Sequence, residues 1–199
     1  MSFTKIFLKE TQEILSILDV EVIEKMVAVI AKVKESGGRI FFAGSGGGAG
    51  HASHAACDFR KLLGIESYSV TDNVSEITAR VNDEGWEHAY SEWLKVSKIS
   101  EKDCLFILSV GGGNRNSKVS LNLCSAIDLA ISQDSFVLGI VGFDGGYTLE
   151  NSDVCLQIPK LNSRLITAQT EGLQAVIWHL IVNHPGLNPS VPKWESLLA

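Results

Sequence analysis

The sequence has little of what membrane-spanning, secreted or nucleic-acid-binding proteins need. Its longest uninterrupted apolar runs have about six residues, whereas a helix that crosses a bilayer needs about 20. The N-terminal stretch, MSFTKIFLKETQEIL, lacks the apolar core of a signal peptide. Acidic residues (23) outnumber lysine and arginine (17), which gives a net charge of −6. This balance argues against nucleic acid or an anionic membrane as the main partner, and we expect a cytoplasmic protein.

Two chemical patterns are also missing. The four cysteines show no CxxC spacing, and Cys104 and Cys155 lie in apolar runs, so we expect buried free thiols in a reducing compartment. Neither GxxxxGKS nor GxxxxGKT occurs, which argues against a P-loop kinase or NTPase. The chain shows no repeat, low-complexity segment or linker. Its 199 residues, 45% hydrophobic and 20% charged, therefore predict one globular domain over 1–199.

Short apolar runs alternate with helical patterns along most of the chain. Continuous apolar strands are typical of a parallel sheet that helices cover on both faces, so the pattern predicts an α/β protein. We expect strands at 40–43, 67–70, 104–108, 136–141 and 154–158. We expect helices at 3–18, 20–36, from 51 onward, and at 76–80, 87–96, 118–132 and 167–183, before an irregular tail with three prolines.

Two helical patterns precede the first strand. Asp19 is a suitable N-cap for the second of them, and the pair Gly37-Gly38 ends it. A compact α/β domain does not need both helices, so we expect residues 1–36 to pack on other subunits. The alternative is that they only cover an edge of the sheet.

The stretch 39–58, RIFFAGSGGGAGHASHAACD, combines the features of a ligand site. An apolar run leads into a glycine-rich turn, Gly44 to Gly50, and then into a helical pattern. Glycine lets the backbone approach a phosphate, and the free N–H groups of a first helical turn point at it. His54 and Asp58 are four residues apart and share one helix face just beyond this turn. The stretch therefore predicts a phosphate-binding site next to residues that transfer protons or bind a metal.

Two further strand ends, at 109–117 and 142–146, are glycine-rich and polar. In open α/β sheets, ligands bind outside the carboxyl ends of the strands. The first of these loops offers hydroxyls and amides with a single cation, which suits one phosphate monoester better than a triphosphate. Its polar residues are Ser109, Asn114, Arg115, Asn116 and Ser117.

The last helical pattern carries Glu171 and His179, eight residues apart. Eight residues are two turns and about 80° of rotation, so both side chains can face one cavity at different depths. With His54 and Asp58 they supply two imidazoles and two carboxylates, which could hold a divalent transition metal, with zinc a reasonable guess. The same groups could equally act as acid and base without a metal. We expect His51 and Cys57 to pack around the site, and His88 and His184 to lie at the surface.

A dinucleotide site is the main alternative from the residues alone. Residues 44–49, GSGGGA, fit the G-x-G-x-x-A fingerprint, and Asp72 ends the next strand, where a ribose-binding acid would lie. Two features count against it. The helix after such a loop normally packs on the sheet through small apolar residues, whereas this one presents His51, His54 and Asp58. The loop at 109–117 also supplies a second set of phosphate donors.

These stretches together resemble the sugar isomerase (SIS) domain family, and within it the phosphoheptose isomerases. The resemblance covers nearly the whole chain, from the two leading helices to His179. It implies a homotetramer of three-layer α/β/α sandwiches, each with a five-stranded parallel sheet, and sites between subunits. The strongest markers are residues 44–58, 71–72, 82–83, 109–117, 142–146 and 171–179.

The resemblance also implies roles for single residues. The family's first site helix carries a histidine and, four residues on, a glutamate that is base and metal ligand; His54 and Asp58 match these positions. Its last helix carries a glutamine and, eight residues on, a histidine that is acid and metal ligand; Glu171 and His179 match by spacing. We therefore expect catalytic Asp58 and His179, a zinc site of His54, Asp58, Glu171 and His179, and substrate contacts from Ser45, Gly46, Gly47, Asp83, Ser109, Gly111, Gly112, Asn114, Ser117 and Glu171.

The activity that the resemblance implies is aldose–ketose isomerisation. We expect conversion of sedoheptulose 7-phosphate to D-glycero-D-manno-heptose 7-phosphate through an enediol. The alternative is a non-catalytic SIS protein, either a sugar-phosphate sensor or a protein-binding module. Such proteins tend to lose the acid and base, so the presence of His54, Asp58, Glu171 and His179 favours an enzyme. The expected partners are a phosphorylated sugar and further copies of the chain, without nucleic acid or membrane.

Overall fold

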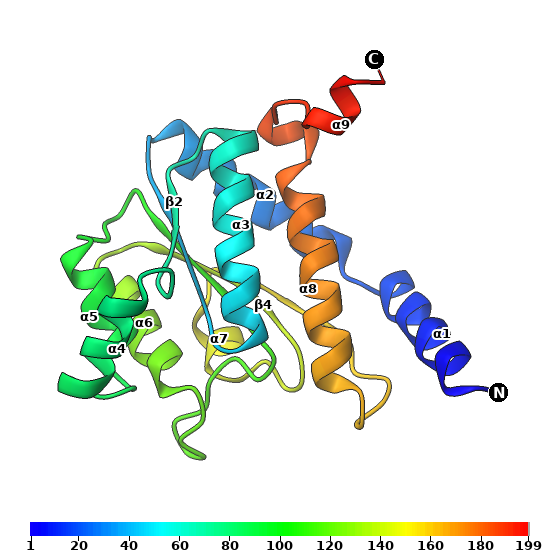
Figure 1. Ribbon diagram of the computed structural model, residues 1–199, viewed down its shortest axis with the longest axis horizontal. Coiled ribbons are helices and arrows are strands. Elements are labelled where there is room, and N and C mark those ends of the chain that lie inside the picture. Colours follow the sequence, from blue (N-terminus) through cyan, green and yellow to red (C-terminus); the bar gives the residue numbers. More distant parts are fainter. Residues whose placement is uncertain (199) are drawn as a thin grey trace.

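A five-stranded, all-parallel sheet forms the centre of the computed structural model, which describes residues 1–198 (Figure 1). The prediction of a parallel α/β sandwich is confirmed. The strands are β1 (Ile40–Gly44), β2 (Ser67–Ser69), β3 (Cys104–Ser109), β4 (Phe136–Val141) and β5 (Val154–Gln157), in the order β2-β1-β3-β4-β5. The helices are α1 (Phe3–Ser16), α2 (Val20–Glu35), α3 (Gly47–Leu63), α4 (Val74–Asp83), α5 (Ala89–Val96), α6 (Leu121–Ser132), α7 (Gly146–Asn151), α8 (Ile166–Val182), the 3₁₀ turn η1 (Pro185–Leu187) and α9 (Lys193–Ser196).

Helices cover both faces of the sheet and enclose two apolar cores. Side chains alternate along a strand, so Ile40 and Phe42 of β1 pack with α2, α3 and α8, while Phe41 and Ala43 pack with α5 and α6 on the other face. All of β1 is buried, which is why its sequence is continuously apolar. Among residues 1–198, no helix is both long and apolar enough to cross a membrane.

The carboxyl ends of β1, β3 and β4 meet at one edge of the sheet. Gly44 pairs in register with Leu108, and Ser109 pairs with Val141. The glycine-rich segments that follow these three strands are therefore neighbours, as the sequence predicts for a ligand site.

Several helix boundaries differ from the prediction. Asp19 caps α2 as expected, since its side chain accepts a hydrogen bond from the Val22 N–H group at 3.2 Å. However, α3 begins at Gly47 rather than after Gly50, because close packing against β3 needs glycine inside its first turn. Helix α6 begins three residues later than expected, since Lys118 and Ser120 adopt positive φ. Helix α7 is absent from the predicted elements, because its six residues are too few to show a period.

The cysteines follow the prediction in part. Cys104 and Cys124 are buried and Cys155 is half-buried. Burial raises the pKa of the Cys155 thiol to about 12, and it raises the pKa of Cys104 as well. Cys57 is exposed, so the expectation that it packs around the site is wrong. The sheet-facing side of α3 is occupied by its neighbours Ala55, Ala56 and Phe59, and Cys57 is turned to solvent.

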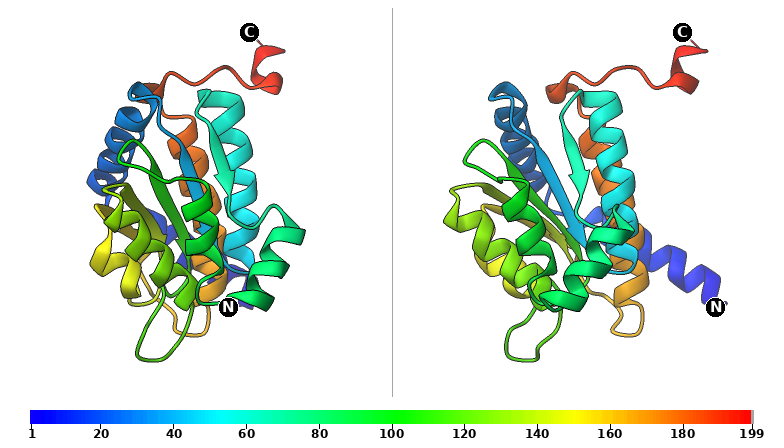
Figure 2. Two further views of the ribbon diagram at one scale, coloured as in Figure 1. Left: turned by 90° about the vertical axis from the view of Figure 1, so that its left-hand side faces the viewer. Right: turned by 60° about the vertical axis from the view of Figure 1, so that its left-hand side comes forward.

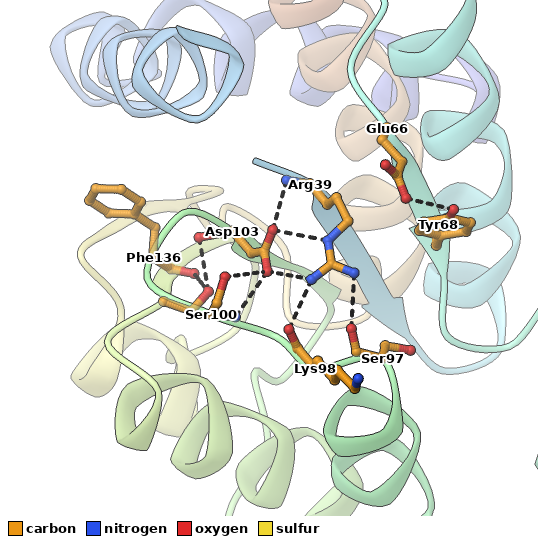
Figure 3. A network of polar contacts seen from close by, with 9 residues as sticks. Arg39, Glu66, Tyr68, Ser97, Lys98, Ser100, Asp103 and Phe136 are labelled. Atoms are coloured by element: carbon orange, nitrogen blue, oxygen red, sulfur yellow. Dashed lines mark hydrogen bonds and ion pairs between the residues drawn. The ribbon is translucent and has the colours of Figure 1, made fainter. Parts of the chain in front are cut away.

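An ion pair between the half-buried Arg39 and the buried Asp103 joins the starts of β1 and β3, at the edge of the sheet opposite the glycine-rich segments (Figure 3). Asp103 accepts hydrogen bonds from the Arg39 backbone N–H, Nε and Nη2 at 2.8, 3.1 and 2.8 Å. It also accepts from the backbone N–H and hydroxyl of Ser100, while Arg39 donates to the carbonyls of Ser97 and Lys98. Burial alone raises the pKa of Asp103, but the Arg39 and Ser100 hydrogen bonds outweigh it and hold the pKa below its ordinary value.

Asp103→Asn should lower the free energy of unfolding by about 2 kcal/mol at pH 7, because the half-buried Arg39 guanidinium loses its buried charged acceptor. A carboxylate with a lowered folded-state pKa contributes stability above its ordinary pKa and loses it as the pH falls through the folded value. Urea unfolding at neutral pH and at successively lower pH should show that the difference in free energy of unfolding between wild type and variant becomes smaller as Asp103 is protonated. The exposed Asp134→Asn is the control. A gap that does not change with pH would contradict this account.

Candidate active site

Helices α3 and α8 carry the predicted ionisable residues and pack side by side over one face of the sheet (Figure 1). Both helices begin at the carboxyl edge of the sheet. His54 and Asp58 lie in the second and third turns of α3, and His179 lies near the end of α8. Glu171 lies eight residues earlier in α8, about 12 Å back along the helix axis at 1.5 Å per residue. The two ends of α8 therefore reach different parts of α3.

His54, Asp58 and His179 form one compact trio. Oδ2 of Asp58 lies 3.7 Å from Nε2 of His54 and 3.7 Å from Nε2 of His179. The side chains are 57%, 19% and 44% exposed respectively, so the carboxylate is shielded while both imidazoles are open to solvent. The structure thus brings together three of the four predicted metal ligands, and it shows a possible metal-binding group.

The tautomer of His179 follows from its backbone contact. Nδ1 lies 2.7 Å from the carbonyl oxygen of Ala175. A carbonyl can only accept a hydrogen bond, so we assign the proton to Nδ1, and this leaves the lone pair of Nε2 directed at the Asp58 side. A histidine held in this way is suited to ligate a metal or to exchange a proton through Nε2.

The spacing and chemistry of the trio fit a zinc ion. A tetrahedral zinc ion with ligand bonds of about 2.1 Å separates its ligand atoms by roughly 3.4 Å. The candidate ligand atoms of His54, Asp58 and His179 all lie within 4.8 Å of one another, so small side-chain movements would complete the geometry. Two histidines and one carboxylate are also a common zinc ligand set.

Glu171 lies outside the trio, at the start of α3. A Cβ atom on Gly47 would lie 2.5 Å from the Glu171 carboxylate, and one on Gly48 would lie 2.2 Å from the Leu108 carbonyl oxygen. Glycine is therefore required at Gly48, where the obstacle is backbone, whereas at Gly47 the obstacle is the end of the flexible Glu171 side chain. The Glu171 carboxylate rests against the first turn of α3, where free N–H groups and the helix dipole favour an anion. The glycine-rich turn thus already faces a carboxylate of the protein itself.

Trp178 supports both imidazoles and was not among the predicted site residues. Its indole is fully buried, stacks on His179 with ring centroids 3.5 Å apart, and meets the edge of His54 at 4.8 Å. The signal in the sequence was weak: Trp178 directly precedes His179, but its contact with His54 depends on how α3 and α8 pack.

The segment after β3 forms a compact polar loop. The Ser109 hydroxyl accepts from the N–H of Gly112 at 3.0 Å, and Oδ1 of Asn114 accepts from the N–H of Ser117 at 2.9 Å. Gly111 is half-buried, and the Ser117 side chain is exposed. Arg115, the one cation of this loop, pairs with Asp128 and Glu87. Hydroxyl, side-chain amide and backbone groups are therefore the donors that remain for a phosphate.

Other predicted residues lie apart from the trio. Asp83 is exposed at the end of α4, where it accepts from the Asn82 amide at 2.7 Å. His88 is exposed as expected, whereas His184 is half-buried and pairs with Glu24 at 3.4 Å. His51 is half-buried in the second turn of α3.

One argument against a dinucleotide site proves wrong. Helix α3 does pack on the sheet through small residues, among them Gly48, Ala52 and Ala55, and it presents its histidines on the opposite side. One helix can thus both pack on the sheet through small residues and present ionisable side chains on its other side. The presence of His54 and Asp58 therefore does not by itself argue against a dinucleotide site.

Comparisons with known proteins discriminate between an SIS-type protein and a dinucleotide-binding protein. No family model matches the chain. The chain is 33% identical over 156 residues to the lincomycin biosynthesis protein LmbN of Streptomyces lincolnensis, covering 73% of this chain and 55% of LmbN, so it spans about half of that relative's length. It is 30% identical over 156 residues to the phosphoheptose isomerase of Colwellia psychrerythraea, covering 74% of this chain and 71% of the relative.

A solved structure agrees with this relationship. The phosphoheptose isomerase GmhA from Neisseria gonorrhoeae superposes with a TM-score of 0.77 over 90% of this chain and 96% of that one, at 24% identity. This likeness confirms the fold that the resemblance implied. The match to the C. psychrerythraea protein is close enough, and covers enough of both chains, to show the family. The chain belongs to the phosphoheptose isomerase family of SIS-domain proteins.

Proposed function

We propose that the chain is an aldose–ketose isomerase that interconverts sedoheptulose 7-phosphate and D-glycero-D-manno-heptose 7-phosphate. The observation that carries this proposal is the trio, in which one oxygen of Asp58 lies 3.7 Å from both His54 and His179. The reaction needs a carboxylate and a group that exchanges protons near neutral pH, and the trio offers both. Membership of the family supports the substrate class. Four free cysteines are consistent with a cytoplasmic setting.

The proposed mechanism moves one carbon-bound proton between C1 and C2. Asp58 takes the proton from C1 of the ketose while His179, entering this step with protons on both ring nitrogens, gives its Nε2 proton to the carbonyl oxygen at C2, which yields the enediol and leaves Nε2 with a lone pair. His179 then removes the proton from the C1 hydroxyl, and the Asp58 carboxyl returns its proton to C2, which gives the aldose. Proton transfer through Nε2 is open to His179, because its Nδ1 is held by Ala175.

We place the phosphate at the loop after β3. The Glu171 carboxylate lies against the first turn of α3, so a second anion there would meet like charge. Ser109, Gly111, Gly112, Asn114 and Ser117 instead offer hydroxyl, amide and backbone groups with no acidic side chain among them. An anchored phosphate would hold C1 and C2 at a fixed distance from this loop, which is how remote binding contributes to rate.

Product formation tests the proposed function directly. Purified protein incubated with sedoheptulose 7-phosphate should convert it to the aldose phosphate until the two reach equilibrium, as followed by chromatography and mass spectrometry. Binding without conversion would favour the sensor alternative. Tight binding of NAD that sugar phosphates do not displace would favour a dinucleotide site.

We further propose that the trio binds zinc, with Glu171 as the fourth ligand that the resemblance implies. Zinc on Nε2 of His179 would replace the proton there, so the metal would polarise the sugar carbonyl in place of protonation by His179. Because Glu171 lies against Gly47 rather than in the trio, its contribution to affinity should be the smallest of the four. Replacing His54 by alanine should therefore weaken zinc binding more than Glu171→Gln does.

Zinc should be measurable without any assay of activity. Protein purified without chelator should contain about one zinc per chain, and adding zinc to chelated protein at 100 times its Kd should raise Tm by about 5 °C or more. The tryptophan emission should change at the same time, because Trp178 stacks on His179. Absence of zinc, with no effect of added zinc on Tm or emission, would leave the trio as an acid–base set only.

We propose a homotetramer in which α1 packs on other subunits. Helix α1 extends from the body in the right-hand view of Figure 2, and Ile14 is its only buried residue. Its Phe3 and Leu8 are 67% and 62% exposed, an apolar surface that a lone subunit leaves in water. Light scattering should give about four times the chain mass of 21.6 kDa.

A substitution on α1 tests this assembly. Leu8→Asp should reduce the mass, whereas Val96→Asp, at an equally exposed position on α5, should not. A mass near that of one chain for the wild-type protein at micromolar concentration would overturn the proposal.

A further inference from the structure

Three buried side-chain atoms of residues 1–198 have no hydrogen-bond partner, namely Asn122 Oδ1, Gln174 Oε1 and Trp178 Nε1. Each belongs to a side chain that contacts the candidate site. Trp178 stacks on the imidazoles, Gln174 donates to the Ser109 carbonyl at 3.2 Å, and Asn122 donates to the Ser45 hydroxyl at 3.3 Å. Unpaired buried polar atoms destabilise a fold. Because all three lie next to the candidate site, we look for a function that explains why they are there.

Asn122 is the one of the three that reaches a hydroxyl. It lies in the first turn of α6, is 0% exposed, and is followed by the apolar Leu123 and Cys124. Its Nδ2 group can only donate, so the Ser45 oxygen must accept. The single proton of the Ser45 hydroxyl is then left for an acceptor, for which the phenol oxygen of the neighbouring Tyr90 and an oxygen of a bound ligand compete. Ser45 is half-buried while Asn122 is fully buried, so of these two residues Ser45 is the one that solvent or a ligand can reach.

The backbone beside Ser45 is fixed from the same side. The buried Tyr90 phenol donates to the Gly44 carbonyl oxygen at 2.7 Å. Burial raises the pKa of Tyr90, so the phenol stays protonated at neutral pH and continues to donate. Because this proton is used on Gly44, it does not satisfy Asn122 Oδ1, which explains why that oxygen lacks a partner.

We propose that Asn122 is a positioning residue for the isomerase reaction: by donating to Ser45, it makes the Ser45 hydroxyl a donor to an oxygen of the bound sugar phosphate. This inference rests on the proposed function and on Ser45 as a substrate contact. Leucine would suit the apolar surroundings of Asn122 and would leave no unpaired oxygen, but it cannot donate. The unpaired oxygen is thus a cost to stability that accompanies the orientation of Ser45.

A double-mutant cycle on the full chain tests the proposal. Asn122→Leu and Ser45→Ala should each lower kcat/KM for sedoheptulose 7-phosphate by about 3- to 10-fold, the size of one net hydrogen bond. The double variant should lose no more than one single variant, because Asn122 acts only through Ser45. A merely structural asparagine would instead lower activity further in the Ser45→Ala background. The Tm of Asn122→Leu should stay within a few degrees of wild type, since the hydrogen bond and the unpaired oxygen disappear together.

Asn122→Asp covers the case in which the leucine variant does not fold. The carboxylate keeps the shape but accepts instead of donating, so it takes the Ser45 proton, and activity should fall at least as far as in Ser45→Ala. Asn151→Leu is the control, because Asn151 is a half-buried amide that, like Asn122, donates one hydrogen bond, to the Tyr147 carbonyl at 2.9 Å, and lies outside the site. It should keep wild-type kcat/KM.

The outcomes separate this inference from the proposed function. A wild-type protein that converts no sugar phosphate overturns both. An active wild type whose losses multiply in the double variant, to about 10- to 100-fold, overturns the inference alone. Unchanged kcat/KM in both Asn122→Leu and Asn122→Asp would do the same.

Discussion

Asp58→Asn is expected to lower the turnover of sedoheptulose 7-phosphate by about 10²- to 10⁴-fold, the range for loss of a general base. Asparagine keeps the shape of the side chain but cannot take the proton from C1. It also weakens the trio as a metal site, because the carboxylate is its only charged ligand. The variant should remain folded, since asparagine has nearly the size and shape of Asp58 and the site of the substitution is not fully buried, with the side chain 19% exposed. Steady-state product formation and a melting curve together check this expectation.

The control for Asp58→Asn is Asp134→Asn, which removes an exposed carboxylate after α6. It should turn over substrate at the wild-type rate. Full activity in Asp58→Asn would mean that another carboxylate is the base. Glu171 would then be the first residue to test, because it is the other acidic residue on the facing helix.

His179→Gln is expected to cause a loss of similar size, about 10²-fold or more. Glutamine can still form hydrogen bonds where Nε2 lies, but it does not exchange protons near neutral pH. Its amide also lacks the ring that stacks on Trp178. His88→Gln, at an exposed position before α5, is the matched control. A His179→Gln variant with normal turnover would contradict the acid role.

The combination of the two changes is also informative. If Asp58 and His179 act as one unit, the double variant should lose far less than the product of the single losses. Losses that multiply would instead indicate two independent contributions. The same kinetic assay distinguishes these results, provided that both single variants fold.

Most of the fold could be predicted because its signals are local. The strands of a parallel sheet are buried on both faces, so β1, β3 and β4 appear as continuous apolar runs. The N-cap at Asp19 is likewise indicated by a few adjacent residues. The start of α3 could not be placed, because glycine usually ends helices. Here Gly48 is needed inside the helix for its close approach to Leu108, a contact between segments far apart in the sequence.

The candidate site could be predicted only in part, for a similar reason. His54 and Asp58 share a helix face by their spacing, so their proximity needs no tertiary knowledge. The distance between Glu171 and His179 along α8 is equally local, yet only the packing of α8 on α3 shows that Glu171 meets Gly47 while His179 meets Asp58. Asn122 carried a weak signal as a polar residue in an apolar run, but its contact with Ser45 joins α6 to the distant loop after β1.

Deuterium exchange tests the central claim most directly, because it reports removal of the carbon-bound proton itself. Wild-type protein and sedoheptulose 7-phosphate are mixed in deuterated water and followed by NMR. The account predicts deuterium at C1 of the ketose and at C2 of the aldose with wild-type protein, and loss of this exchange in Asp58→Asn. A wild-type protein that binds the sugar phosphate but introduces no deuterium would contradict the account and identify a sensor instead.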